Sequence, residues 1–141
     1  KLILGGVEIP HSKGLLGHSD SDVLVHAVCD ALLGAMGEGD LGRHYPSSDP
    51  KYKGISSLKL LEDVMTRLQA KGYQVGNIDT VIVAQAPRLG PYLSAMQKKI
   101  AETAGIVPEL VNVKGKSGEG LDAVGHEEGM IAQAVCLIEP V

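Results

Sequence analysis

The sequence predicts an α/β (α+β) fold, a two-layer sandwich with a mixed β-sheet on one side and three helices on the other. Short apolar stretches, typical of strands, alternate along the chain with longer stretches in which apolar residues recur at helical spacing. The chain of 141 residues is long enough for one hydrophobic core, and neither an internal repeat nor a linker divides it. We therefore expect a single domain over residues 1–141.

The first strand is predicted over residues 2–9, with a turn or bulge at Gly5 and Gly6. The first helix is predicted over residues 23–33. Its residues are apolar almost all round, which is typical of a buried helix. Three residues before it could cap its N-terminus: Ser19, Asp20 and Ser21.

Two further helices are predicted, each with one apolar face. The second begins at Ser56 or Ser57 and stops at Gly72, and the third stops at Gly105. The residues expected on their inner faces are Leu60, Leu61, Val64, Met65 and Leu68, then Leu93, Met96, Ile100 and Ala104. The remaining expected strands cover residues 77–86, 111–113 and 130–138, and the expected loops cover residues 40–53 and 114–129.

Charge and composition exclude several classes of protein. The net charge of −4 argues against a general nucleic-acid binder. No apolar run reaches the length of a membrane span, and no signal-peptide pattern is present. Cys29 and Cys136 stand alone in apolar segments, which favours buried thiols in a reducing compartment. We therefore expect a cytoplasmic protein.

Three ionisable residues share one stripe of the first predicted helix. Asp22, His26 and Asp30 recur every four residues, so they lie on one face. Ionisable groups on a buried helix are costly unless they are paired or bind a metal. Two interpretations of His26 are open, a metal ligand or a hydrogen-bonded core histidine. The two aspartates could simply hold loops by accepting backbone hydrogen bonds.

A second group of polar residues suits a phosphorylated ligand. Arg88, Lys114 and Lys116 follow or end predicted strands and could meet a phosphate. Ser117 lies among glycines, which let a backbone approach an anion closely. Glu119 could hold a divalent cation near such phosphates. An alternative interpretation is that the glycines only form a turn.

Several co-linear motifs resemble the family of 2-C-methyl-D-erythritol 2,4-cyclodiphosphate synthases, enzymes of the non-mevalonate isoprenoid pathway. The motifs span nearly the whole chain in the family's order. They are GGVEIP at residues 5–10, HSDSD at 18–22 with His26, DALLG at 30–34, GDLG at 39–42, YPSSDP at 45–50, AQAP at 84–87, VNVK at 111–114 and EG at 128–129.

The resemblance implies a homotrimer with active sites between neighbouring subunits. The implied reaction is an attack by the substrate's 2-phosphate on the β-phosphorus of its cytidine diphosphate arm, which releases CMP and closes a cyclic diphosphate. A phosphate has its second pKa at about 6, so this nucleophile is largely ionised at neutral pH. Catalysis then reduces to positioning and charge neutralisation. The implied cofactors are Zn²⁺ and either Mg²⁺ or Mn²⁺, and the implied location is the cytoplasm of a bacterium or a plastid.

The resemblance also assigns roles to single residues. His18 and Ser117 are expected to stabilise the transition state, His26 to bind zinc, and Glu119 to bind magnesium or manganese. The residues expected around the methylerythritol are Asp40, Leu41, Gly42, Tyr45, Pro46, Ser47, Ser48 and Asp49, and His18 and Ser19 are also expected to bind the substrate. Those expected around the cytosine and the nucleotide phosphates are Ala84, Gln85, Ala86, Pro87, Arg88, Leu89, Gly90, Lys116, Ser117, Gly118, Glu119, Ala123 and His126.

The chain departs from the family pattern in several places. The family's other two zinc ligands, an aspartate and a histidine one residue apart, precede the segment that matches residues 2–10 and have no counterpart here. Because the chain begins at Lys1 in what reads as a strand, we expect a further strand segment upstream; the alternative is a variant of the family that binds less metal. The remaining departures are Ser47 for a common aspartate, Lys116 and Ser117 for threonines, and His126 for an arginine.

Two rival classes of function are open at this point. The first is a trimeric binding module that holds cytidine nucleotides or a prenyl phosphate without turnover. The second is a structural α/β domain in which Asp22, His26 and Asp30 satisfy one another.

Overall fold

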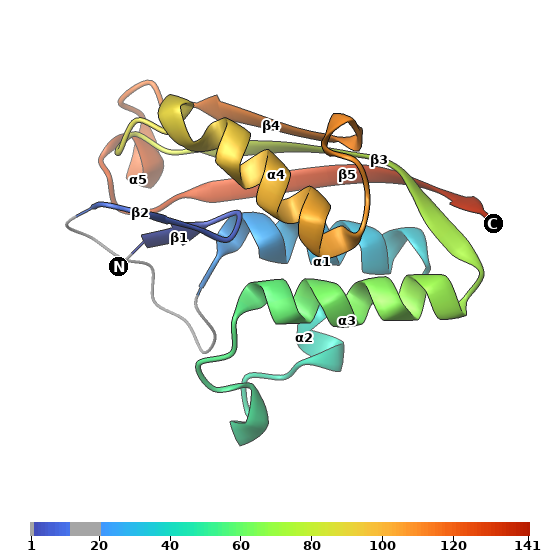
Figure 1. The fold of residues 1–141 in the computed structure, drawn as a ribbon. Coiled ribbons are helices and arrows are strands. Elements are labelled where there is room, and N and C mark those ends of the chain that lie inside the picture. The colour runs from blue at the N-terminus through green and yellow to red at the C-terminus, as the bar shows by residue number, and fades with distance from the viewer. Residues whose placement is uncertain (1, 12–20) are drawn as a thin grey trace.

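The computed structural model describes residues 2–11 and 21–141 and is built on a three-stranded mixed sheet (Figure 1). β3 (Tyr73–Val83) lies between β4 (Val111–Lys116) and β5 (Ile131–Pro140). β4 runs parallel to β3, whereas β5 runs antiparallel to it. The predicted mixed sheet in an α/β fold is therefore confirmed.

The first predicted strand is a hairpin of two short strands, β1 (Leu2–Leu4) and β2 (Val7–Ile9). Gly5 and Gly6 form its turn with φ angles of 57° and 75°, a backbone conformation that favours glycine. A Cβ added at Gly5 would also lie 2.7 Å from the Cβ of Met96. The expectation of a turn at these two glycines is therefore confirmed.

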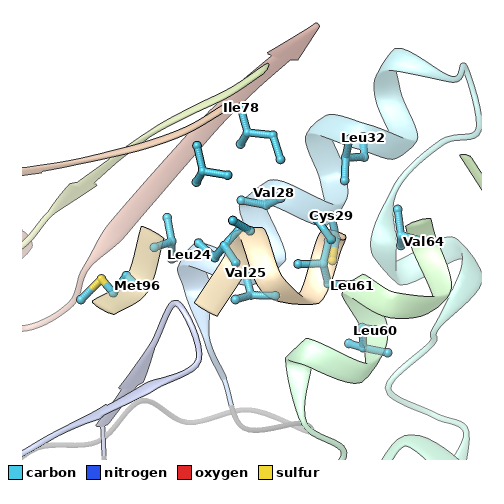
Figure 2. Packing of buried hydrophobic residues seen from close by; sticks show 14 of the residues in the cluster. Leu24, Val25, Val28, Cys29, Leu32, Leu60, Leu61, Val64, Ile78 and Met96 are labelled. Carbon is cyan, nitrogen blue, oxygen red and sulfur yellow. The ribbon is translucent and has the colours of Figure 1, made fainter. Parts of the chain in front are cut away.

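Three long helices pack against the sheet or against one another. α1 (Val23–Ala35) lies along β5, α4 (Leu93–Ala104) lies along β4, and α3 (Ser57–Ala70) packs against both helices. The apolar faces predicted for α3 and α4 point into the core, where Leu61, Val64 and Leu68 have no exposed surface. Figure 2 shows side chains of α1 and α3 meeting Ile78 of β3 and Met96 of α4 in this core.

Strand alternation gives the sheet a covered face and an open face. The β5 side chains that pack against the core are Ala132, Ala134, Cys136 and Ile138. The intervening positions point the other way, and Ile131, Val135 and Leu137 are 51%, 64% and 68% exposed. The chain therefore carries an apolar strip on β5, which we call the β5 outer strip, that its own helices do not cover.

The expected cap of α1 is wrong. Asp22 caps the helix, because its carboxyl group accepts a hydrogen bond from the amide of Val25 at 3.0 Å. Ser21 precedes this cap, and Ser19 and Asp20 lie outside the described residues.

Two expected loops contain short helices. The first loop holds α2 (Leu41–His44) and the 3-10 helix η1 (Pro50–Tyr52), and the second holds α5 (Asp122–Gly125). None of the three has a buried residue, so no apolar period marks them in the sequence. Two further 3-10 helices are η2 (Gly90–Tyr92) and η3 (Pro108–Leu110).

β3 starts four residues before its predicted first residue, and β4 continues to Lys116. Gly76 lies at a register shift between β3 and β5, which breaks the alternation of inward and outward side chains by which a strand is recognised in a sequence. Among the described residues, no helix is long and apolar enough to cross a membrane.

Candidate active site

β3 and β4 end side by side, and the loops that leave them form a pocket. Val83 pairs with Lys116, and the amide of Ala84 donates to the carbonyl oxygen of Lys116 at 2.9 Å. Ligands of α/β proteins commonly bind outside the carboxyl ends of parallel strands. The pocket at this position has a volume of about 200 Å³ and is lined by Ala84, Gln85, Pro87, Arg88, Leu89, Gly90, Leu93, Gly115, Lys116 and Ser117.

This pocket, which we call the strand-end pocket, joins two segments that the sequence presents far apart. One wall is the turn after β3, in which Ala84 and Leu89 are buried and a cis peptide bond joins Ala86 to Pro87. The other wall is the end of β4. Each wall contributes one exposed cation, Arg88 or Lys116. The pocket therefore combines apolar walls with two positive charges, a combination that suits a nucleotide.

Ser117 and Glu119 follow directly in a tightly wound loop. Glu119 has a φ of 54°, and its amide donates to the Oγ atom of Ser117 at 3.2 Å. The amide of Gly120 donates to Oε1 of Gln85 at 3.3 Å, so the Gln85 side chain reaches across from the other wall. These contacts place the two expected site residues next to the strand-end pocket.

The loop closes on itself through glycines. A Cβ added at Gly118 would lie 2.7 Å from the nitrogen of Gly125, and one added at Gly125 would lie 2.2 Å from the carbonyl carbon of Gly120. This contact places α5 against the start of the loop. Ala123 in α5 and His126 just after it are both exposed, and Nδ1 of His126 lies 3.9 Å from a carboxyl oxygen of Glu128.

Lys114 is not part of the strand-end pocket. Its ammonium group binds Oδ2 of Asp79 at 2.8 Å, and Nδ2 of Asn112 donates to the other carboxyl oxygen at 3.0 Å. The hydrogen bond from Lys114 lowers the pKa of Asp79 below its ordinary value. The position of Lys114 therefore does not support the hypothesis that this residue binds a phosphate.

The polar stripe on α1 serves three different partners. Asp22 is fully buried and accepts from the amides of Gly5 at 2.9 Å and Gly6 at 2.7 Å. Asp30 accepts from the amide of Leu41 at 2.7 Å. The interpretation that both aspartates hold loops is confirmed, and the idea that the three residues satisfy one another is wrong.

His26 contacts α3. Its Nε2 atom lies 2.8 Å from the Oγ atom of Ser57, which is fully buried. With that contact kept, a metal bound to this ring would use Nδ1. In the part of the chain that the structure describes, no three His, Cys, Asp or Glu side chains are placed to hold a metal ion together. His26 therefore supplies one donor of the kind that zinc prefers.

The described residues expected around the methylerythritol, 40–42 and 45–49, form one segment beneath α3. Asp40 caps α2 by accepting from the amide of Arg43 at 2.9 Å, and Asp49 accepts from the amide of Lys51 at 3.0 Å. Leu41, Pro46 and Tyr45 are half-buried, whereas Gly42, Ser47 and Ser48 are exposed. Figure 1 shows α2 on the far side of α3 from α5 and from the ends of β3 and β4.

The expected site residues thus fall into two groups within one chain. The strand-end pocket brings residues 84–90 together with residues 116–117, and the loop that follows brings Glu119 beside them. His26 and residues 40–49 lie with α1 and α3 instead. His18 and Ser19 lie outside the described residues.

The chain is similar to one family of proteins along nearly its whole length. The model of the YgbB family matches residues 1–139. A protein of Syntrophotalea carbinolica named 2-C-methyl-D-erythritol 2,4-cyclodiphosphate synthase is 55% identical over 138 residues, which cover 98% of this chain and 84% of that protein. A protein of the same name from Desulforamulus reducens is 55% identical over 139 residues, which cover 99% of this chain and 88% of that protein.

Solved structures agree with these similarities. The bifunctional IspDF from Campylobacter jejuni superposes with a TM-score of 0.95 at 38% identity, covering 99% of this chain and 38% of that one. A 2C-methyl-D-erythritol-2,4-cyclodiphosphate synthase in its CDP-bound form superposes with a TM-score of 0.90 at 33% identity, covering 98% of this chain and 89% of that one.

Proposed function

The chain belongs to the YgbB family, and we infer that it is an enzyme with 2-C-methyl-D-erythritol 2,4-cyclodiphosphate synthase activity. The reaction converts 4-diphosphocytidyl-2-C-methyl-D-erythritol 2-phosphate into 2-C-methyl-D-erythritol 2,4-cyclodiphosphate and CMP. The structural observation that supports this function is the strand-end pocket, which combines apolar walls with two cations where a nucleotide would bind.

The strand-end pocket is the proposed cytidine site. Residues 84–90 surround the base, and its volume of about 200 Å³ suits one pyrimidine ring. Arg88 and Lys116 offer charge-assisted hydrogen bonds to the diphosphate. The hydroxyl group of Ser117 donates to a phosphate oxygen, and Ala123 and His126 of the α5 region border the same side. A relative solved with CDP supports a cytidine nucleotide as the ligand.

The chemistry is an intramolecular phosphoryl transfer. An oxygen of the 2-phosphate forms a bond to the β-phosphorus, and the bond from that phosphorus to the bridging oxygen breaks. The electron pair of the broken bond leaves with CMP. Because the attacking phosphate is already ionised near neutral pH, no protein base has to remove a proton. The chain's residues accelerate the reaction by holding both ends of the substrate and by neutralising the charge that accumulates between them.

The segment beneath α3 is the proposed methylerythritol site. The Asp40 carboxyl group accepts hydrogen bonds from the hydroxyl groups of the diol, and the backbone of Leu41 and Gly42 borders it. The residues proposed to complete this site are His18, Ser19, Tyr45, Pro46, Ser47, Ser48 and Asp49. His18 together with Ser117 is proposed to stabilise the transition state.

Membership of the family implies a divalent metal ion. We propose zinc at His26 and magnesium or manganese at Glu119, since imidazole nitrogen suits the first and carboxylate oxygen the second. Such ions supply charge neutralisation at the phosphates when they are bound. Zinc analysis of the purified protein should give about one ion per chain, and His26→Ala should abolish it. Full zinc content in that variant would remove His26 from the site.

We also propose a homotrimer in which each active site lies between neighbours, with the sheet facing the centre and the helices outside. Two observations support it. His26 lies beside Ser57 of α3, and α2 lies on the far side of α3 from the ends of β3 and β4, which supports a site completed by a neighbour. The β5 outer strip is apolar and uncovered, as a surface meant for another copy would be. Cys29 and Cys136 form no disulfide, which agrees with the cytoplasm as the proposed location.

Turnover distinguishes the enzyme from the alternative of a cytidine-binding module. The test is phosphorus NMR of the protein with the diphosphocytidyl substrate, zinc and magnesium. We expect signals of CMP and of a cyclic diphosphate. CMP with an open-chain product that carries two separate phosphate monoesters would mean that water is the nucleophile, and absence of CMP would support binding without turnover.

A further inference from the structure

The segment between Gly37 and Ser56 packs against the core through three partly buried side chains, Leu41, Tyr45 and Ile55. None of its residues is buried, although the residues that flank it, Met36 and Ser57, are. Figure 1 shows this segment, which includes α2 and η1, below α3 in the view. A segment with few buried apolar contacts opens locally at low free-energy cost. Polar side-chain contacts therefore add to the limited apolar packing that holds this segment against the rest of the molecule.

Tyr45 makes such a contact with α3. Its hydroxyl group donates a hydrogen bond to Oδ2 of Asp63 and accepts one from Nε of Arg67 at 3.4 Å. Asp63 and Arg67 are one helical turn apart and form an ion pair with an N–O distance of 3.5 Å. The Arg67 guanidinium also lies 5.9 Å from the centre of the Tyr45 ring, which allows a cation–π contact. We call these three residues the Tyr45 clamp.

The clamp is connected to the rest of the segment. The ring of Tyr45 meets the ring of Tyr52 edge to face, with centroids 5.5 Å apart. Nζ of Lys51 lies 5.0 Å from the centre of the Tyr52 ring. Holding Tyr45 therefore also fixes η1 and the turn of Ser47 and Ser48 that lies between the two tyrosines in the sequence.

We propose that Asp63 and Arg67 are positioning residues that hold the polyol-binding segment of the active site through their hydrogen bonds with the hydroxyl group of Tyr45. This proposal rests on the function proposed above, because it assigns residues 40–49 to the methylerythritol. Neither α3 residue needs to touch the substrate. Their exposed fractions, 52% for Asp63 and 39% for Arg67, place them at the surface, where the hydrophobic core does not depend on them.

Hydrogen exchange tests the clamp without any substrate. Asp63→Ala should speed exchange of the backbone amides in residues 41–53, while the amides of α1, β3 and the rest of α3 keep their protection. Glu62→Ala is the matched control, because it removes a neighbouring exposed carboxylate that does not contact Tyr45. Equal exchange in the two variants would overturn the clamp.

Steady-state kinetics tests what the clamp is for. Asp63→Ala and Tyr45→Phe should each raise KM for the diphosphocytidyl substrate about three- to tenfold, the effect of one or two hydrogen bonds, with kcat within about twofold. Asp63→Asn keeps an acceptor oxygen, so its KM should lie between that of Asp63→Ala and that of the unaltered protein. Binding of CMP alone should be unchanged, because the strand-end pocket does not include the clamp.

The outcomes separate the two proposals. If the unaltered protein releases no CMP from the substrate, the proposed function fails and the role in polyol positioning fails with it, although hydrogen exchange still decides whether the clamp exists. If the unaltered protein is active and Asp63→Ala has the KM of Glu62→Ala, positioning by the clamp is wrong. A parallel loss of CMP affinity would also contradict it, because it would indicate a general loss of structure.

Discussion

At the scale of single residues, Asp22 shows how a buried carboxyl group is accommodated. The sequence identifies it as an oddity on an apolar helix but cannot say whether a metal or the backbone satisfies it. The structure gives three backbone amides, those of Gly5, Gly6 and Val25, as its partners. Two of these are distant in sequence, and nothing in the local pattern reveals them. Asp22 therefore joins the hairpin to the start of α1.

Asp22→Ala should lower the free energy of unfolding by about 3 kcal/mol, because it leaves buried amides without an acceptor and removes the helix cap. Urea denaturation measures the change. Asp30→Ala is the control, since Asp30 is exposed and its carboxyl group accepts a hydrogen bond from the amide of Leu41. That variant should lose less than about 1 kcal/mol. Equal losses in the two variants would contradict the role given to Asp22.

Tyr45 gives a second prediction at this scale. Burial, followed by the hydrogen bond to Asp63, raises its pKa from 10.0 to about 12. Because the pKa is raised in the folded state, the stability that this group contributes is present below pH 10 and is lost as the pH rises toward 12. Tyrosinate absorbance, taken as the difference from Tyr45→Phe, should show the late titration. In Asp63→Ala the pKa should fall only part of the way, since burial remains, whereas Glu62→Ala should leave it unchanged.

At the scale of elements, the sequence predicts the parts that depend on apolar period. The helices α3 and α4 and their core faces follow from that period, because burial of a stripe is what stabilises them, and α1 follows from residues that are apolar almost all round. The short helices α2 and α5 could not be predicted in this way. A carboxyl cap at Asp40 holds α2, and close approach between glycines fits α5 against its loop. Such contacts leave no periodic trace in a single sequence.

Gly125→Ala tests the element that carries Ser117 and Glu119. The added Cβ would lie 2.2 Å from a backbone atom of Gly120, so the loop has to change its course. We expect kcat/KM to fall more than about tenfold, because misplaced site residues lose transition-state contacts, while the melting temperature changes little.

Gly129→Ala is the matched control for this variant. A Cβ at Gly129 would meet no atom within 4 Å, so activity should be retained. A fully active Gly125→Ala would show that the loop's shape is not needed for turnover.

At the scale of the whole molecule, the sequence resemblance names the site residues but cannot place them. The structure unites those of the strand-end pocket, because β3 and β4 are parallel neighbours whose ends coincide. His26 instead contacts Ser57 of α3, and α2 lies on the far side of α3 from that pocket's strand ends. Such separation depends on tertiary packing, which no motif encodes. If the protein is the proposed trimer, the two groups of residues should meet across the interface between neighbouring subunits.

Mixing two inactive variants tests whether neighbours share a site. His26→Ala and Ser117→Ala should each be nearly inactive alone. Unfolded together in equal amounts and refolded, they should regain about a quarter of the activity, because in random trimers that fraction of sites draws both intact halves from different subunits. In the control, the two variants are refolded separately and then combined under conditions that prevent the exchange of subunits. No recovery in refolded trimers would place both residues in one subunit's site.

The central position of β3 also affects how the chain is made. β3 needs β4 on one edge and β5 on the other, and β5 leaves the ribosome well after β3 does. Until then a nascent chain presents an open strand edge, and α1 lacks the strand along which it packs. Exposed strand edges of this kind recruit chaperones or pair with other chains. The sheet that shapes the strand-end pocket is therefore completed late in synthesis, and a slow passage through Ile131–Pro140 would prolong the interval in which the chain is most prone to aggregate.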